Sequence, residues 1–305
     1  MRTLAYTLTD VFTDRIFGGN QLAVFTQPPA LSTGEMQAIA RELNLSETVF
    51  VYEPDHARHH RKLRIFTPDI ELPMAGHPTI GTAYVLANEG LIETVEGENV
   101  WVFEEGVGDI TVIVQKENGR IGKIEMFQPT PVFGEVFHNK QSAAELLSLA
   151  VEDIRQDLPI QTVSTGVPFL FIPVQSLAAM RRIHFRPDVW QEGFATDEHT
   201  RHIFAFAVET ENADSDVHSR MFAPAMGIRE DPATGGASGP LGVYLVEHGV
   251  VPPAVQGVYE IRSEQGLEMG RPSLIDITVV KHGHEYKQVK VGGTSVKVGE
   301  GKLYV

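Results

Sequence analysis

The sequence predicts an α+β protein built from two similar domains, and three observations support this prediction. Short apolar runs rich in β-branched and aromatic residues outnumber the segments with helical spacing. The two kinds of segment do not alternate regularly, which argues against a doubly wound parallel sheet. The third observation is a faint internal repeat in a chain of 305 residues, about twice the ~150 residues of a typical domain.

Apolar runs punctuated by Gly and Pro predict the strands, which cover residues 22–25, 49–52, 110–114, 169–174 and 275–280. Three helices are predicted among them. Ser32 with Glu35 forms a capping-box start, followed at helical spacing by Met36, Ile39, Ala40 and Leu43. Ser142 with Glu145 opens a second helix in the same way.

A third helix is predicted in the apolar segment that follows Gly76 and His77. Pro78 can occupy its first turn, Ile80, Ala83, Tyr84 and Ala87 share one face, and Gly90 is placed to end it.

The internal repeat links residues 64–68 (Arg-Ile-Phe-Thr-Pro) with residues 220–224 (Arg-Met-Phe-Ala-Pro). Downstream, Gly76-His77 before the apolar segment 81–86 resembles Gly235-Gly236 before the segment 242–245. Each copy predicts a strand, a loop, a glycine-rich turn and a buried helix. We therefore expect two facing domains, 1–130 and 131–305, divided near Pro129-Thr130-Pro131, and the last strand can cross back to the first domain.

Composition excludes several classes of function. The chain has 25 Lys and Arg against 40 Asp and Glu, a net charge of −15, which disfavours nucleic-acid and anionic-membrane partners. It has no cysteine, so disulfides, thiolate metal sites and cysteine nucleophiles are excluded. Without a signal-peptide pattern or a long apolar stretch, we expect a cytoplasmic protein, and we further expect a homodimer.

No nucleotide, flavin or metal motif is present, so no cofactor and no metal are expected. His56, His59 and His60 lie among Arg58, Arg61 and Lys62, and we interpret this segment as a solvated basic loop.

The first chemical candidate is Glu47, which stands between Leu45 and the apolar run 49–51. A carboxyl drawn into apolar surroundings suits a proton shuttle near neutral pH. The alternative is a solvated glutamate at a strand edge, or one that caps a turn.

The second and third candidates lie at the two glycine-rich turns. His77 can donate to a substrate carboxylate or share a proton, and the alternative is a capping or packed histidine. Asp231 can accept hydrogen bonds from a substrate while the amides of Gly235 and Gly236 hold an anion, and the alternative is a plain N-cap or Asx-turn aspartate. Backbone N–H groups at a helix start bind carboxylates without a cationic side chain.

At these residues the chain resembles the PhzF-like family of phenazine-biosynthesis isomerases. The matching strings occupy residues 10–14 with 17–20, 45–51, 64–68, 76–79, 164–169, 230–235 and 264–266 with 269–272, so they span nearly the whole chain. The resemblance implies the diaminopimelate-epimerase-like fold. That fold has two similar domains, each a β-sheet rolled into a barrel around a central helix, with the active site in the interdomain cleft.

The resemblance also implies roles for individual residues. The position matching Glu47 takes a proton from carbon and returns it elsewhere on the substrate, and those matching His77 and Asp231 bind and polarise the substrate. Gly76, Gly235, Gly236 and Ser46 complete the expected substrate-binding set for a small anionic carboxylate. Relatives of the fold that racemise amino acids use two cysteines, and that mechanism is impossible in this chain.

One departure concerns Gly236, where family members often have serine. Because this hydroxyl is missing, another allylic or enamine-type carboxylate is at least an equal candidate for the natural substrate beside trans-2,3-dihydro-3-hydroxyanthranilate. The sequence thus predicts a cofactor-independent isomerase with Glu47 as its acid/base. Two alternatives stay open: an epimerase or tautomerase with a second base from His77 or Asp231, and a catalytically silent binder of small molecules.

Overall fold

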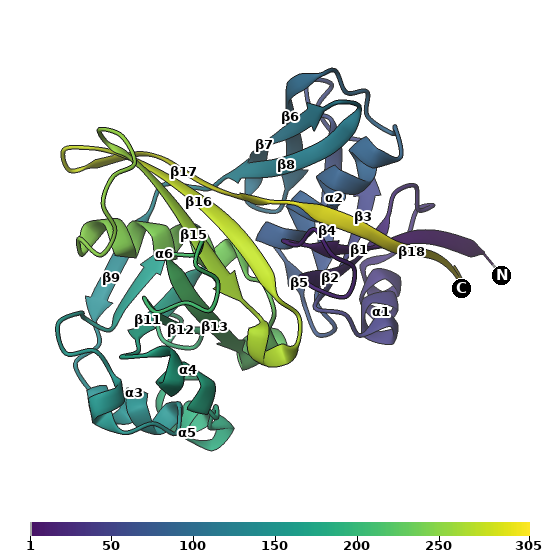
Figure 1. Ribbon diagram of the computed structural model, residues 1–305. Coiled ribbons are helices and arrows are strands. Elements are labelled where there is room, and N and C mark those ends of the chain that lie inside the picture. Colours follow the sequence, from purple (N-terminus) through teal and green to yellow (C-terminus); the bar gives the residue numbers. More distant parts are fainter. Residues whose placement is uncertain (1) are drawn as a thin grey trace. The chain divides into compact units, whose positions relative to one another are not determined.

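The computed structural model describes residues 2–305, which divide into two compact units (Figure 1). Of the described residues, the first unit comprises 2–127 with Val291–Val305, and the second comprises Gln128–Lys290. Strand β17 (Glu285–Gly293) contains the boundary between them. No helix in the described part of the chain is long and apolar enough to cross a bilayer.

In the first unit one strongly curved sheet wraps around a central helix. Strand β1 (Thr3–Val11) pairs with β18 (Ser295–Tyr304) and β2 (Asn20–Phe25); the order continues through β3 (Glu47–Tyr52), β4 (Arg61–Phe66), β6 (Gly97–Glu105), β7 (Gly108–Glu117) and β8 (Arg120–Phe127). The pairs β2–β3 and β4–β6 are parallel, and the short β5 (Glu71–Leu72) lies against β4.

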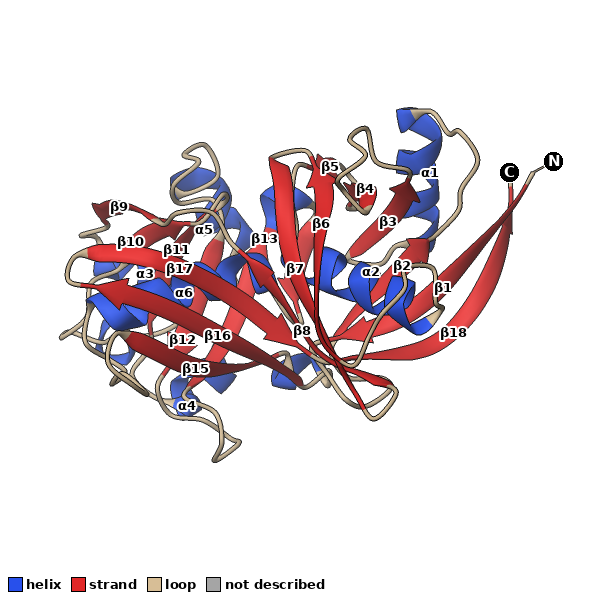
Figure 2. Cartoon of the chain, turned by 90° about the horizontal axis from the view of Figure 1, so that it is seen from above, coloured by secondary structure: helices blue, strands red, loops and turns tan. Residues whose placement is uncertain are grey.

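Helix α2 (Gly76–Asn88) contacts strands from both ends of this order, β1 and β18 as well as β7 and β8 (Figure 2). Eleven of its residues are buried, as expected for a helix enclosed by a sheet. A Cβ on Gly81 would lie 2.6 Å from side-chain atoms of Val11 and Leu22, so glycine permits this close packing. Helix α1 (Thr33–Leu43) packs outside, against β3 and β4.

The second unit repeats this topology. Strand β9 (Val132–Val136) pairs with β10 (Gln161–Ser164), and the order continues through β11 (Pro168–Pro173), β12 (Ile203–Ala207), β13 (Val217–Ala223), β15 (Val258–Gln265) and β16 (Ser273–His282). The pairs β11–β12 and β13–β15 are parallel, and the short β14 (Ile228–Asp231) lies against β13. Helix α6 (Gly235–Glu247) contacts β10, β11, β15 and β16.

Smaller elements complete the second unit. An outer apolar cluster joins α3 (Lys140–Leu146), α4 (Leu177–Arg182) and α5 (Pro187–Gly193) to β11, β12 and β13. Short 3₁₀ turns cover Val151–Asp153, Pro224–Met226 and Leu267–Met269.

The predicted α+β class and the internal repeat are confirmed. Arg64 in β4 and Arg220 in β13 make the same contacts in their own units. Each arginine forms an ion pair with a glutamate of the adjacent short strand, Glu71 or Glu230, and lies 5.3 Å from the centre of a phenylalanine ring two residues on. The two copies of the repeated string therefore hold equivalent places.

The predicted strands and two of the three helix starts are also confirmed. Ser32 and Glu35 form both hydrogen bonds of a capping box, Pro78 lies in the first turn of α2, and Gly90 follows its end with a φ of 67°. The predicted capping box at Ser142 is wrong. Asn139 is the N-cap of α3, and its side chain accepts a hydrogen bond from the Ser142 N–H.

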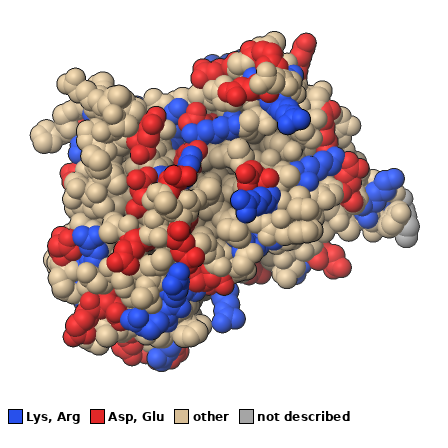
Figure 3. Space-filling view, viewed as in Figure 1, with Lys and Arg blue, Asp and Glu red and all other residues tan. Residues whose placement is uncertain are grey.

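Charged side chains of opposite sign are interspersed on the face shown in Figure 3. Several exposed cations already have carboxylate partners in the same unit, among them Arg181 with Glu211 and Arg186 with Asp188.

Candidate functional site

The first cluster joins the start of β3 to the start of α2. Glu47 is the first residue of β3 and His77 is the second residue of α2, and both side chains are buried. Glu47 Oε2 lies 3.0 Å from His77 Nε2. Since Glu47 is only 5% exposed, the alternative of a solvated strand-edge glutamate is wrong. The fold thus brings two of the predicted residues within proton-transfer distance.

The third member of this cluster is Asn20, the first residue of β2, which was not among the residues predicted from the sequence. Its side-chain Nδ2 lies 3.1 Å from His77 Nδ1. An amide NH₂ can only donate, so Nδ1 accepts and the proton of a neutral ring lies on Nε2, the ring nitrogen close to Glu47. The available signals were its position two residues before the apolar run 22–25 and its place at the end of the string 17–20, one of those that carry the family resemblance.

The backbone conformation of Gly19 positions Asn20 beside His77. The φ of Gly19 is 60°, and a Cβ there would lie 2.3 Å from the carbonyl oxygen of Val11. Only glycine fits so close to β1 in this conformation, so the chain can turn at Gly19 and enter β2 with Asn20 beside His77.

Two further predicted residues flank this cluster. Ser46 forms the bend that precedes β3 and is partly exposed. Gly76 is the first residue of α2, where backbone N–H groups have no acceptor within the helix. The positive end of the helix dipole favours an anion at this position.

The second cluster lies in the other unit and centres on Asp231, the last residue of β14. Asp231 is 3% exposed, and its Oδ2 accepts a hydrogen bond of 2.6 Å from Thr234 Oγ1. The N-cap of α6 is Thr234, so the alternative of Asp231 as a plain N-cap is wrong.

Gln265, which the sequence analysis did not single out, holds this turn together. Its Nε2 donates to the Asp231 carbonyl oxygen at 2.7 Å and to Thr234 Oγ1 at 2.9 Å, and its Oε1 accepts from the Thr234 N–H. The available signal was its place in the string 264–266, one of those that carry the family resemblance.

Gly235 and Gly236 are the first two residues of α6, and neither has a positive φ. A Cβ on Gly236 would meet no described atom within 4 Å, so the position has room for a side chain. Ser238 does not replace the missing hydroxyl, because it is fully buried and its Oγ donates to the Thr234 carbonyl oxygen.

The repeat shows what the second unit has at the place of Glu47. Val49 pairs with Ile65, and Phe204 pairs with Met221; Ile65 and Met221 each follow the repeated arginine. Glu47 lies two residues before Val49, and His202 lies two residues before Phe204. His202 is therefore the counterpart of Glu47. Burial, together with the charge of Arg201, lowers the pKa of His202 to about 4, so its ring is neutral and weakly basic at pH 7.

Two buried histidines elsewhere have structural roles. His59 lies between Glu104 at 2.7 Å and Asp109 at 3.1 Å, and His218 lies between Glu264 at 2.7 Å and Glu268 at 2.9 Å. The expectation of a solvated loop is therefore wrong for His59, which is 7% exposed. No cluster of three metal-ligating side chains occurs among the described residues.

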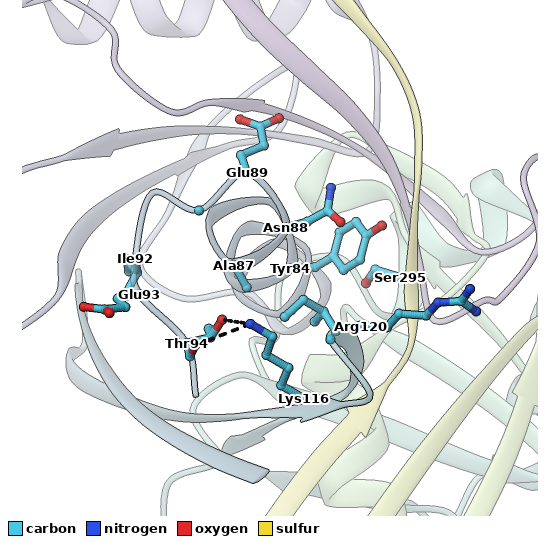
Figure 4. A pocket seen from close by; sticks show the side chains of 13 residues that line it. Tyr84, Ala87, Asn88, Glu89, Ile92, Glu93, Thr94, Lys116, Arg120 and Ser295 are labelled. Carbon is cyan, nitrogen blue, oxygen red and sulfur yellow. Dashed lines mark hydrogen bonds between the residues drawn. The ribbon is translucent and has the colours of Figure 1, made fainter. Parts of the chain in front are cut away.

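A separate cavity of about 910 Å³ lies at the opposite end of α2 (Figure 4). Tyr84, Asn88 and Glu89 line it from the end of the helix, and Lys116 crosses it to bond Thr94. With a rise of ~1.5 Å per residue, the helix separates this cavity from His77 by more than ~10 Å. It is not part of the Glu47 cluster.

Comparisons with known proteins give a consistent result. Residues 9–301 match the family model PhzC-PhzF, described as phenazine biosynthesis-like protein. The chain is 38% identical to an uncharacterized isomerase of Mesorhizobium japonicum, over 100% of both chains. It is 35% identical to the trans-2,3-dihydro-3-hydroxyanthranilate isomerase of Pseudomonas chlororaphis, over 98% of both.

Solved structures agree with the fold. The phenazine biosynthesis protein of the PhzF family from Bacillus anthracis superposes with a TM-score of 0.89 at 29% identity, over 100% of both chains. A hydroxyproline epimerase from Agrobacterium vitis shares the fold at 14% identity, with a TM-score of 0.67 over 99% of this chain and 92% of the epimerase. The expected epimerase-like architecture is thereby confirmed.

Proposed function

Because the chain belongs to the PhzC-PhzF family of phenazine biosynthesis-like proteins, we propose that it is a cofactor-independent isomerase that moves a proton within a small carboxylate substrate. Its similarity to isomerases across the whole chain makes it an enzyme of that class. The finer assignment rests on the site geometry, and one observation carries it: a buried carboxylate, Glu47, 3.0 Å from a buried histidine.

In the proposed reaction the Glu47 carboxylate takes a proton from a substrate carbon. The electron pair of that C–H bond moves into the adjacent π system, and the protonated Glu47 returns the proton to another carbon. Bonds broken and formed balance, and no oxidant or reductant is needed. His77, with its proton directed to Nε2 by Asn20, binds and polarises the substrate next to Glu47.

Binding of the carboxylate is assigned to backbone groups. In the first unit, the first-turn N–H group of Gly76 suits an anion and Ser46 adds a hydroxyl. In the second unit, the first-turn N–H groups of Gly235 and Gly236 suit an anion. Asp231, held in place by Thr234 and Gln265, accepts a hydrogen bond from an N–H or O–H of the substrate. We propose an allylic or enamine-type carboxylate, with trans-2,3-dihydro-3-hydroxyanthranilate as the first compound to test.

The weak basicity of His202 makes it a poor second base. A two-base epimerase needs a second group that accepts a proton near pH 7, and the pKa of His202, at the position equivalent to Glu47, is lowered to about 4, so His77 or Asp231 would have to supply that group. The proposal therefore keeps Glu47 as the group that both removes and returns the proton.

Isotope exchange tests the proposal. In ²H₂O, NMR should show deuterium entering the substrate or product carbon when the enzyme is present, and Glu47→Gln should abolish this exchange while ligand binding persists. A protein that binds the compound with neither exchange nor conversion to product would be a silent binder, and the isomerase proposal would be wrong. We also propose a cytoplasmic homodimer, which light scattering coupled to gel filtration and fractionation of cells can check.

A further inference from the structure

The end of β6 holds the turn that leads into α2. Glu105 is the last residue of β6, and its Oε1 lies 2.5 Å from Thr79 Oγ1. The Ala75 N–H, at the N-cap of α2, donates to the same carboxyl group. Just beyond, the Val107 N–H donates to the Pro73 carbonyl oxygen at 3.0 Å. Ala75 supplies no side-chain cap, so Glu105 takes over that function for the helix.

In the second unit, the amide side chain of Gln265 makes the equivalent contacts. Lys62 pairs with Glu104, and the equivalent His218 pairs with Glu264, so Glu105 and Gln265 hold equivalent positions in the repeat. Gln265 accepts from the N–H of Thr234, the N-cap of α6, just as Glu105 accepts from that of Ala75. A side chain that is neutral at every pH thus holds α6, and a carboxyl group holds α2.

The hydrogen bonds of the Thr79 hydroxyl show which protonation state of Glu105 is compatible with the structure. Thr79 Oγ1 lies 2.7 Å from the Ala75 carbonyl oxygen, and its counterpart Ser238 donates to the Thr234 carbonyl oxygen in the same way. A hydroxyl has one proton to donate. When Thr79 gives it to Ala75, the short contact with Glu105 requires a proton on the carboxyl, so Glu105 donates to Thr79.

The surroundings of Glu105 agree with a neutral carboxyl. Its Oε2 is buried and has no hydrogen-bond partner among the described residues, an unfavourable place for a full charge. Burial raises the pKa of Glu105 to about 8 and outweighs the lowering effect of the Ala75 N–H and of any hydrogen bond donated by Thr79.

The titratable groups on the elements that pack here are engaged elsewhere. His77 on α2 lies beside Glu47, while Glu104 on β6 and Asp109 on β7 both contact His59. Among the described residues, no cation forms an ion pair with Glu105 that would stabilise its charged form.

We propose that Glu105 is a positioning residue which, as a neutral acid, holds the first turn of α2 and so places Gly76 and His77 for the proton transfer. The effect on turnover rests on the proposed function, whereas the protonation state does not. Ionisation of Glu105 would put a negative charge beside the backbone N–H groups assigned to the substrate carboxylate. Substrate affinity should therefore fall when Glu105 loses its proton.

The first experiment needs no substrate. Protein labelled with ¹³C at the glutamate carboxyls is titrated by NMR, and the signal that disappears in Glu105→Gln is assigned to Glu105. We expect its midpoint near pH 8. A midpoint below pH 6 would show a carboxylate at neutral pH and overturn the inference.

The second experiment measures kcat and KM with trans-2,3-dihydro-3-hydroxyanthranilate from pH 6 to 9.5. Glu105→Gln supplies the neutral side chain that Gln265 uses, so it should stay within about threefold of the wild type at pH 7, and Glu105→Ala should lose about tenfold or more. Above pH 8 the KM of the wild type should rise and that of Glu105→Gln should not. Glu98→Gln, an exposed position on the same strand, is the matched control.

Identical pH profiles for the wild type and Glu105→Gln would refute the positioning role. If Glu105→Ala does not fold, the glutamine variant and the NMR titration still decide the matter. If the wild type shows no turnover, the proposed function fails, and the ¹³C midpoint still confirms or rejects the neutral Glu105.

Discussion

Asn20 donates from Nδ2 to Nδ1 of His77 over 3.1 Å, and this contact sets which ring nitrogen faces Glu47. The two residues are 57 positions apart in sequence and meet because β2 lies beside α2 and Gly19 lets the chain turn closely against β1. The site thus depends on a buried amide that takes no part in the proton transfer.

The first prediction follows from that contact. In Asn20→Leu the ring of His77 loses the donor that holds Nδ1 as an acceptor, so the other tautomer becomes populated and Nε2 no longer presents a proton to Glu47. We expect kcat to fall by about tenfold or more with a smaller change in KM. Steady-state kinetics measure this effect, and ¹⁵N NMR of the ring reports the tautomer directly. An unchanged ring spectrum would show that Asn20 does not set the tautomer.

The second prediction concerns the acid/base itself. Glu47→Gln keeps the shape of the side chain but cannot carry a proton, so turnover should fall by ~10²–10⁴. Binding of a substrate analogue, measured by calorimetry, should change little, because the assigned anion-binding groups are backbone N–H groups. The control is His202→Gln at the equivalent position of the second unit, which should leave the proton transfer rate within a few-fold. If the two variants lose activity equally, the one-base mechanism is wrong.

Local sequence rules were sufficient for much of this fold but not for its site. The capping box at Ser32 and the stop at Gly90 depend on residues a few positions apart, and both were predicted correctly. The capping box predicted at Ser142 is wrong because Asn139, which lies outside that motif, accepts the hydrogen bond from the Ser142 N–H that the Glu145 side chain was expected to accept.

Contacts that depend on strand register could not be predicted in this way. His59 looked solvated among basic neighbours, yet the β4–β6 pairing brings Glu104 against it. Asn20 and Glu105 act through partners 57 and 26 positions away, so no pattern of neighbouring residues predicts either contact. The repeat provided the one long-range signal, and comparing its two copies identified Gln265 as the counterpart of Glu105.

The third prediction concerns stability. Burial opposes the charge on His218, but hydrogen bonds to Glu264 and Glu268 outweigh it and raise its pKa to about 9, above the ~6.5 of an unfolded chain. The folded state therefore binds this proton more tightly, and its contribution to stability is complete below pH ~6.5 and disappears as pH rises through about 9. Glu264 also holds the N–H groups of Glu211 and Asn212, so a loop is tied to the sheet through this cluster.

Denaturant unfolding at pH 6 and at pH 9.5 measures this contribution. His218→Gln should be less stable than the wild type at pH 6, and the difference should narrow at pH 9.5. His184→Gln changes an exposed histidine of the same unit and should behave as the wild type does at both pH values. A constant difference between His218→Gln and the wild type across this range would show that the charge of His218 contributes nothing to stability.

The fourth prediction concerns the substrate and uses the room at Gly236. A Cβ there meets no described atom within 4 Å, and the residue lies in the first turn of α6 without a positive φ, so Gly236→Ser should fold normally. A site that hydrogen-bonds a substrate group discriminates strongly through that bond, and a glycine offers no such donor. We therefore expect Gly236→Ser to gain activity toward trans-2,3-dihydro-3-hydroxyanthranilate and to lose activity toward bulkier or less hydroxylated carboxylates.

The control variant Gly236→Ala separates the effect of the hydroxyl from that of the added volume, because alanine adds a side chain without a hydrogen-bond donor. Comparison of kcat/KM for the three proteins on a small panel of allylic carboxylates measures the effect. If the unmodified protein already converts the hydroxyanthranilate well and serine adds nothing, then Gly236 does not determine the substrate, and the assignment of an alternative carboxylate is wrong.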